Sequence, residues 1–365
     1  MRKENIFSPR HVGNHESGRL GKRYGSPKRR LRKLFSFFAI AIFVLIGVKF
    51  THAVDDSQMF GVYTATVNGD NFKAVIVDAQ REMTHARVSP DGQWITFTRY
   101  NRKGWGRYAT ESGGYEQTEI MVMKTDGTDL RSVVPPKKKI ISANSSWTPD
   151  GKGLIYVSND NPENKGRIHR IDLATGKIEI IQIHPDILAA DPHLVKNKLV
   201  VSAFNEKGAK QMILWMTDME SGKSKQLTSP PMPRDSKGLK PLPGDFDPRM
   251  SPDGTKVVTM RHMGKDNWHL VVVDLASGHE KDLSEADAVD GVAEWSSDSQ
   301  RLIFWHVNKK ELLKSGIYTM KPDGSDRKRI PLPRGHMYVH PSFFPNDGSG
   351  HNARVIFSAR KEPKL

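Results

Sequence analysis

Residues 147–157 read Trp147-Thr148-Pro149-Asp150-Gly151-Lys152-Gly153-Leu154-Ile155-Tyr156-Val157. The middle of this stretch suits a type I turn, because Ser or Thr favours its first position, Pro its second and Gly its fourth. The residues that follow are apolar and rich in β-branched and aromatic types, as buried strands require. The stretch therefore predicts a β-hairpin.

The same phrase recurs along the chain. Clear copies are Val88-Ser89-Pro90-Asp91-Gly92 and Met250-Ser251-Pro252-Asp253-Gly254, and less regular ones are Trp295-Ser296-Ser297-Asp298-Ser299 and Phe343-Phe344-Pro345-Asn346-Asp347-Gly348. A second turn with Gly follows in each unit, as at Asp126-Gly127. Two hairpins make four strands, and a repeat of roughly 45 to 60 residues is typical of a β-propeller.

The two ends of the repeat region complete each other. Residues 62–77 form a lone expected hairpin, and residues 341–359 form another. Joining them in one blade removes the exposed strand edges of an open array. With complete units starting near Met83, Ser142, Ala190, Asp245 and Asp290, the count is six blades. We expect an all-β, six-bladed propeller whose last blade is closed by N-terminal strands.

The amino-terminal region has a different composition. Residues 1–33 hold eleven Lys or Arg against two Glu, so they carry +9 of the chain's net +15. Leu34 to Val48 is uncharged and apolar, a length between that of a signal-peptide core and a spanning helix. We expect a basic, disordered cytoplasmic tail over 1–33, a signal-anchor or signal-peptide helix over 34–53, a linker over 54–59 and the propeller over 60–365. A buried core helix is the alternative for the apolar run.

This arrangement predicts the location of the propeller. The positive-inside rule keeps the basic tail in the cytoplasm and places the propeller in the periplasm or outside the cell, either anchored in the inner membrane or released by cleavage near Ala53. The chain contains no cysteine, which excludes disulfides and thiolate metal sites. We expect a monomer that does not bind nucleic acid.

The repeats resemble those of TolB-type six-bladed propellers. The phrases at 88–92, 147–151 and 250–254 look like that family's Trp-Ser-Pro-Asp-Gly-Lys repeat, and Met123-Lys124-Thr125-Asp126-Gly127 looks like its second hairpin. The resemblance covers about residues 60–360 and implies the fold, while one such repeat serves many functions. TolB proteins are periplasmic and carry an α/β domain before the propeller. No such domain is expected here, because only six residues separate Ala53 from the first strand.

Candidate functional residues come from equivalent positions of the first strand in each blade. The residue three places before the Trp147-equivalent position is polar in five of the six blades. These positions hold His85, Asn144, Asp191, Asp247, Val292 and His340. Two places further along stand Arg87, Ser146, His193, Arg249, Glu294 and Ser342. We predict that they surround the mouth of a central channel, either as a solvated polar channel or as a peptide-binding funnel.

A metal site is the alternative interpretation. His85 and His340 lie in adjacent blades, and imidazole with carboxylate suits a divalent transition metal. The resemblance extends to propeller lyases that act on oligogalacturonates with a histidine-bound metal. Arg87 and Arg249 could instead neutralise Asp191 and Asp247.

Two other features have simpler interpretations. Each Asp-Gly turn offers one carboxylate, whereas calcium requires six to eight oxygens, so we expect these turns to be structural. Trp105, Tyr108 and Tyr115 lie in a long loop over 101–118 and could stack on sugars, although packing on the blade is commoner. Trp94, Trp147, Trp215, Trp295 and Trp305 are expected in the core.

The sequence contains no Gly-x-Ser-x-Gly elbow and no compact metal spacing. We therefore expect a non-enzymatic propeller, without a cofactor, that binds a protein or a cell-envelope polymer. The alternative is a metal-dependent lyase acting on acidic polysaccharide. The partner itself is not encoded in any motif that we find.

Overall fold

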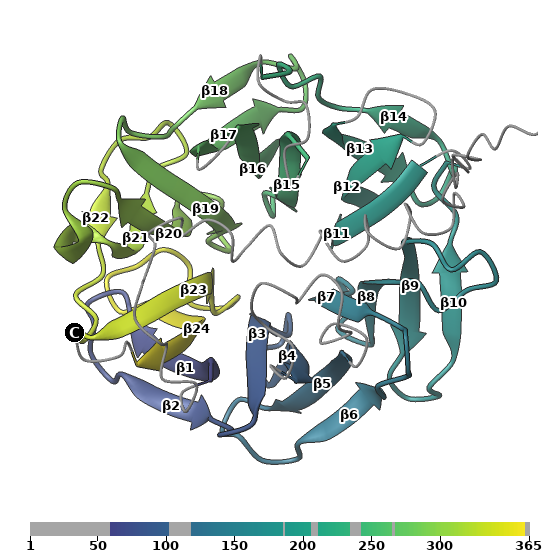
Figure 1. Cartoon of the computed structure of the whole chain (residues 1–365), viewed down its shortest axis with the longest axis horizontal. Helices are drawn as coiled ribbons and strands as arrows, with labels where there is room; N and C mark the ends of the chain where they lie inside the picture. The colour runs from purple at the N-terminus through teal and green to yellow at the C-terminus, as the bar shows by residue number, and fades with distance from the viewer. Residues whose placement is uncertain are drawn as a thin grey trace, which may run out of the picture.

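The computed structural model describes residues 59–101, 118–184, 187–205, 211–233, 242–264 and 267–361. Its β-sheets stand like blades around one axis, as Figure 1 shows. Within this part of the chain the helical structure is a single 3₁₀ turn, η2 (Leu312–Lys314), and no helix has the length and apolarity to cross a bilayer. The expected tail and helix over 1–53 lie outside the described residues, as does the loop over 102–117.

The strands confirm the all-β prediction. The first two sheets contain β3 (Arg81–Val88), β4 (Trp94–Asn101), β5 (Glu119–Lys124) and β6 (Arg131–Val134), and then β7 (Ser142–Trp147), β8 (Gly153–Ser158), β9 (Arg167–Asp172) and β10 (Ile178–Ile181). The third contains β11 (Ile187–Val195), β12 (Lys198–Asn205), β13 (Met212–Asp218), β14 (Ser224–Gln226), β15 (Gly244–Met250), β16 (Lys256–Gly264), β17 (Asn267–Asp274) and β18 (Glu280–Asp282). The fourth contains β19 (Ala288–Trp295), β20 (Leu302–Asn308), β21 (Gly316–Met320) and β22 (Lys328–Arg329).

The last sheet joins the two ends of the described chain. It has the order β2-β1-β24-β23, formed by β1 (Gly61–Thr66), β2 (Lys73–Ile76), β23 (His336–Phe343) and β24 (Arg354–Lys361). Strand β1 pairs antiparallel with β24 from Gly61 opposite Ala359 to Thr66 opposite Arg354. The predicted closure by N-terminal strands is confirmed.

The sheet count differs from the six separate blades that the repeats predict. The described strands form four sheets of four strands and one sheet of eight. The eight-stranded sheet arises because Met212 of β13 pairs in parallel with Gly244 of β15. A Cβ on Gly244 would lie 1.9 Å from the Met212 carbonyl oxygen, so only glycine lets the two backbones approach this closely.

The Pro-Asp-Gly phrases form hairpin turns for a local reason. In the turn at Thr148, the Gly151 amide donates to the Thr148 carbonyl at 2.9 Å, and the Thr148 hydroxyl donates to Asp150 Oδ1 at 2.6 Å. Asp150 Oδ1 also accepts the Lys152 amide at 3.1 Å. Equivalent bonds occur in the turns at Ser89, Ser251 and Ser296. The turn carboxylates are thus occupied by their own turns, which supports the structural interpretation over calcium binding.

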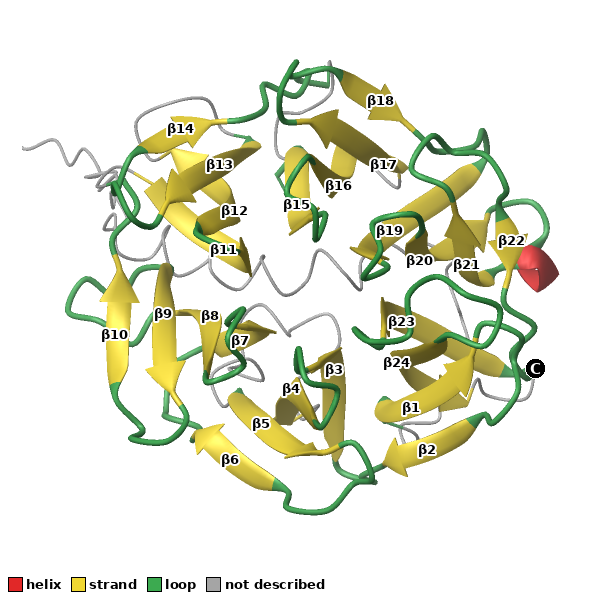
Figure 2. Cartoon of the chain, turned by 180° about the vertical axis from the view of Figure 1, so that it is seen from behind, coloured by secondary structure: helices red, strands yellow, loops and turns green. Residues whose placement is uncertain are grey.

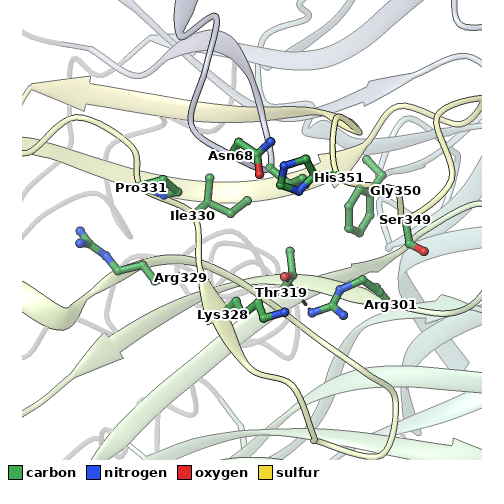
Figure 3. A pocket seen from close by; sticks show the side chains of 12 residues that line it. Asn68, Arg301, Thr319, Lys328, Arg329, Ile330, Pro331, Ser349, Gly350 and His351 are labelled. Carbon is green, nitrogen blue, oxygen red and sulfur yellow. Dashed lines mark hydrogen bonds between the residues drawn. The ribbon is translucent and has the colours of Figure 1, made fainter.

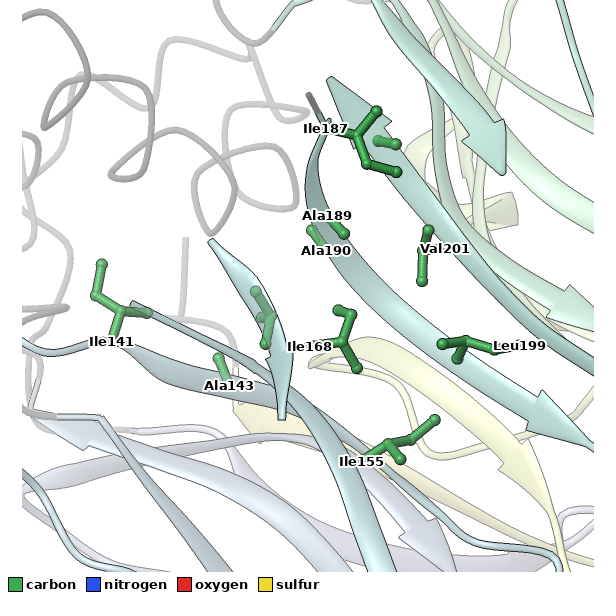
Figure 4. Close-up of a cluster of buried hydrophobic side chains, with 11 residues drawn as sticks. Ile141, Ala143, Ile155, Ile168, Ile187, Ala189, Ala190, Leu199 and Val201 are labelled. Carbon is green, nitrogen blue, oxygen red and sulfur yellow. The ribbon is translucent and has the colours of Figure 1, made fainter. Parts of the chain in front are cut away.

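Burial decreases from the axis to the rim of the ring. The innermost strands β7 and β15 are buried at every residue, whereas the outer strands β2 and β10 are exposed or half-buried throughout. Neighbouring blades pack through apolar faces, as Figure 4 shows for Ile155 and Ile168 against Leu199 and Val201. Trp147, Trp295 and Trp305 are buried as predicted, but Trp94 and Trp215 are only half-buried.

Candidate functional site

Each innermost strand carries the same irregularity at its centre. In β3, Thr84 pairs with Thr98 and Arg87 with Thr96, so two residues of β3 stand opposite one residue of β4. This is the geometry of a β-bulge, which bends a strand and redirects side chains. The same two-residue shift occurs in β7, β11, β15, β19 and β23.

The first residue of every bulge is one of the six predicted ring positions. All six have left-handed backbones, with φ values of 57° (His85), 55° (Asn144), 49° (Asp191), 47° (Asp247), 39° (Val292) and 52° (His340). Asn, Asp and His tolerate this region better than most residues, but a β-branched Val rarely adopts it. Val292 therefore shows that neighbouring strands impose the conformation even where the side chain opposes it. We call these six residues the inner ring.

The inner ring is buried. Its side chains were expected to line a solvated channel, but all six residues are at most 9% exposed. They are buried because side chains from different sheets meet at the axis and pair there. Three groups of contacts can be distinguished.

The first group is a stacked histidine pair. The rings of His85 and His340 have centroids 3.8 Å apart and an interplanar angle of 31°. His85 Nδ1 lies 3.1 Å from the Thr84 hydroxyl, while His85 Nε2 and both ring nitrogens of His340 have no hydrogen-bond partner in the described chain. Burial lowers the pKa of both imidazoles well below the ordinary value, and the charges of Arg87 and Arg249 lower it further. Both rings are therefore neutral at pH 7.

The second group is a carboxyl pair. The Asn144 side-chain amide donates to Asp191 Oδ1, and the Asp247 backbone amide donates to Asp191 Oδ2 at 3.5 Å. Burial raises the pKa of both carboxyls, and the charge of Asp247 raises that of Asp191 further. Asp247 Oδ1 has no hydrogen-bond partner among the described residues.

The third group bridges distant blades. Glu294 Oε2 lies 3.3 Å from Arg87 Nε and 3.2 Å from Arg249 Nε, with side chains 12%, 7% and 4% exposed. The arginines thus pair with Glu294, whereas the sequence suggested the aspartates. Neither Nε forms a hydrogen bond within the described structure, and Arg87 Nη2 is also without a partner. Burial lowers the pKa of Arg87 to about 10, so it stays charged at pH 7.

The remaining predicted residues hold the strands in place. His193 is half-buried, and its Nδ1 accepts the Met250 backbone amide at 2.9 Å, which places any ring proton on Nε2. Burial lowers the pKa of His193 to about 4. Ser146 and Ser342 are buried small residues. The Trp147 indole donates to the Arg87 carbonyl at 3.0 Å, and the Trp295 indole donates to the Arg249 carbonyl at 2.9 Å. Each indole thus links the strand of an arginine to the neighbouring sheet.

The metal alternative receives little support from this arrangement. In the described part of the chain no three His, Asp or Glu side chains converge on a point where an ion could sit. The two imidazoles lie face to face, whereas metal ligands must direct ring nitrogens toward a common centre. Both imidazoles also lie near the positive charges of Arg87 and Arg249, which oppose the binding of a metal cation.

Sequence reasoning missed two buried ion networks beside the inner ring. Arg261 Nε donates to Asp245 Oδ1 at 2.6 Å, and its Nη1 donates to Glu280 at 2.6 Å. In the next sheet, His306 Nδ1 lies 2.7 Å from Asp290 Oδ1, and Arg327 Nη2 lies 3.0 Å from Asp290 Oδ2. Asp245 and Asp290 occupy equivalent positions of their strands, and this was the signal that could have revealed them.

A hollow lies at the rim between the sheets of β22 and β23, shown in Figure 3. It has a volume of about 320 Å³ and is lined by Asn68, Arg301, Lys328 and His351, among others. Arg301 and Lys328 are already paired with Asp326 at 2.7 and 2.8 Å. Two of the cations that line the hollow therefore share one carboxylate. The aromatic residues at 105, 108 and 115 lie outside the described residues.

Comparison with known proteins finds a partial likeness to TolB proteins. No protein-family model matches the chain. The Tol-Pal system protein TolB of Xanthomonas oryzae pv. oryzae (strain PXO99A) is 32% identical over 108 residues, which are 28% of this chain and 23% of that protein. The chain thus matches less than a quarter of the length of this curated relative.

Solved structures extend the likeness in fold. Putative TolB from Agrobacterium tumefaciens has a TM-score of 0.60 at 12% identity, covering 85% of this chain and 100% of its own. TolB from Acinetobacter baumannii has a TM-score of 0.51 at 13% identity, covering 84% and 64%. The chain is therefore a propeller similar to TolB proteins in fold and, over about a quarter of its length, in sequence.

Proposed function

We propose that this chain is a non-enzymatic, extracytoplasmic propeller that binds a protein or an envelope polymer at the axis of its ring. The binding surface is formed by His85, Arg87, Asn144, Asp191, His193, Asp247, Arg249, Glu294 and His340. The eight-stranded sheet counts in this proposal as two blades joined at Met212 and Gly244, which makes six blades with a TolB-like repeat. The TolB relatives are named as parts of a Tol-Pal system, which favours a partner in the envelope.

One observation carries the proposal. Buried polar atoms are nearly always hydrogen-bonded, because an unpaired one costs free energy. Seven such atoms at the axis have no hydrogen-bond partner in the described chain: Arg87 Nε and Nη2, Arg249 Nε, His85 Nε2, both ring nitrogens of His340, and Asp247 Oδ1. A ligand that supplies an acceptor to the Arg87 side and a donor to the Asp247 side would satisfy both.

The remaining parts of the proposal concern location. The basic segment 1–33 and the apolar run within 34–53 would tether the propeller to the inner membrane with its ring outside the cytoplasm, or direct its export before cleavage near Ala53. Residues 54–59 would form the linker. The propeller would act as a monomer, because closure leaves no long free strand edge at the junction of β1 and β24.

The test is crosslinking of the full chain in cells, followed by purification and identification of what is attached. The variant His85→Asn/His340→Asn keeps residues that tolerate the left-handed backbone but removes both imidazoles. The control is His351→Asn, since His351 is exposed in the loop between β23 and β24. We expect one partner to be retained by the control and lost, by at least tenfold, by the inner-ring variant.

Equal recovery of the partner by both variants would exclude the inner ring as the binding surface. Metal content of the same purified samples separates the alternative. A stoichiometric transition metal that disappears only in His85→Asn/His340→Asn would replace the proposal with the metal-dependent lyase, to be assayed on uronic-acid polymers.

A further inference from the structure

We infer that the loop between β20 and β21, residues 309–315, contacts the surface of an anionic lipid membrane and inserts two leucines among the headgroups. Leu313 is 77% exposed and Leu312 is 50% exposed, and they are adjacent. Leu313 has the largest exposed fraction among the large hydrophobic residues of the described chain, where Val77, Ile178 and the others stand singly. We call residues 309–315 the leucine loop.

The leucine loop is held in shape by its own hydrogen bonds. Asn308 Oδ1 accepts the amides of Lys310 and Glu311 at 3.0 and 2.7 Å. The Asn308 backbone amide donates to the Ser315 hydroxyl at 3.1 Å, and the Tyr318 hydroxyl donates to the Lys314 backbone carbonyl at 2.6 Å. None of the three residues of η2 is buried. The polar groups thus fix the loop while its two leucines face water.

Lysines surround the leucines. The loop reads Lys309-Lys310-Glu311-Leu312-Leu313-Lys314. Lys310 pairs with Asp287 at 2.6 Å and Lys314 with Glu311 at 2.7 Å, and these two lysine side chains are 73% and 60% exposed. Exposed ion pairs contribute little, so phosphate headgroups can replace the carboxylates at small cost. Apolar residues flanked by Lys are the combination that binds anionic bilayer surfaces.

The equivalent loop of another blade lacks this character. Residues 159–166 connect β8 to β9 and read Asn-Asp-Asn-Pro-Glu-Asn-Lys-Gly. Apart from Pro162 it contains no apolar side chain. The leucines are therefore not a requirement of the strand connection itself.

The leucine loop also lies on the face at which β1, the first described strand, begins. His306 pairs with Gly316 at the β20–β21 junction, and Ala359 pairs with Gly61 at the β24–β1 junction, so both are junctions between the second and third strands of a blade. The two sheets are neighbours, and the loop's 3₁₀ turn, red in Figure 2, stands at the rim beside β22.

This common face supports a membrane as the occupant. Ten residues, 49–58, separate the apolar run from the first described residue, and ten residues span at most about 35 Å. A tether of that length would hold this face toward the bilayer. This step rests on the tether in the proposed function, whereas the exposed leucines and lysines do not.

The absence of cysteine from the sequence permits a clean test. The full chain carries one cysteine, Leu313→Cys, labelled with an environment-sensitive fluorophore and mixed with vesicles of phosphatidylcholine alone or with phosphatidylglycerol. The control is Ala276→Cys, exposed in the turn between β17 and β18 on the opposite face. With a lipid-borne quencher we expect at least a twofold loss of emission at position 313 in phosphatidylglycerol vesicles, and no loss at 276.

The same emission at 313 and 276 in both kinds of vesicle would overturn the inference. Equal quenching of 313 with and without phosphatidylglycerol would overturn its electrostatic part. Adding Leu312→Ser to Leu313→Cys is expected to reduce the quenching. Cosedimentation reports the tether separately: a chain that stays in the supernatant of phosphatidylcholine vesicles contradicts the tether, while quenching at 313 in anionic vesicles still upholds the loop.

Discussion

The hairpin turns and the inner ring both recur around the propeller, but the turns share their side-chain hydrogen bonds whereas the inner ring shares only its backbone conformation. The turns at Ser89, Thr148, Ser251 and Ser296 repeat their chemistry, since each hydroxyl donates to the Asp two residues later. The inner ring repeats only its backbone. All six positions are left-handed, yet they hold two imidazoles, two carboxyls, one amide and one isopropyl group.

This difference separates positions whose residue type the fold restricts from positions whose side chains can serve a function. A turn must supply its own hydrogen bonds, so its residue types are restricted wherever it occurs. A ring position receives its conformation from the bulge and from neighbouring sheets, so its side chain is free to vary. The fold therefore leaves chemical freedom at the axis, where the proposed binding surface lies.

The largest expected effect comes from removing the charge that bridges the blades. Glu294→Gln leaves Arg87 and Arg249 buried without a carboxylate, which should lower the free energy of unfolding by about 3 kcal/mol. Urea denaturation followed by Trp fluorescence measures it. The matched control is Glu311→Gln at an exposed ion pair, expected to change stability by less than about 0.5 kcal/mol. Equal effects would mean that the axis is solvated like the surface.

The next effect is a pH dependence due to His340. Its folded pKa is lowered, so below about pH 6.5 the unfolded chain binds a proton that the native protein does not, and stability falls with acidification. From pH 7 to pH 5 one such histidine costs at most about 2 kcal/mol. His340→Asn should remove this part, as measured by urea denaturation at both pH values.

Asp191 and Asp247 act in the opposite direction, because their raised pKa values let the native protein bind protons first. Their contribution is present in wild type and variant alike. His351→Asn should leave the wild-type profile unchanged, and a profile for His340→Asn that matches it would contradict the burial of a neutral imidazole at the axis.

The smallest expected effect concerns the hairpin turns. Asp150→Ala and Asp253→Ala each remove the acceptor for a turn hydroxyl and a backbone amide, and each should cost about 1 kcal/mol. Because the two turns use the same bonds, the two costs should agree within about 0.5 kcal/mol by thermal or urea unfolding. A difference above about 1 kcal/mol would show that turns, like the inner ring, depend on their blade.

Much of the architecture was predictable from sequence because its causes are local. Turn chemistry and strand periodicity depend on residues close together in the chain, and they located the hairpins, the closure of β1 on β24, and the six ring positions. The join between β13 and β15 was not predictable, since it depends on how closely Gly244 approaches Met212 in space.

The sequence by itself determined which residues lie at the axis, because equal spacing from each repeated turn selects equivalent strand positions. Only the tertiary structure decided what they do to one another. Glu294 pairs with Arg87, 207 positions earlier in the chain, because the ring places β19 and β3 around the same axis, and no spacing rule encodes that approach. The burial that makes His85 and His340 neutral has the same origin, since a pKa shift depends on neighbours from other strands.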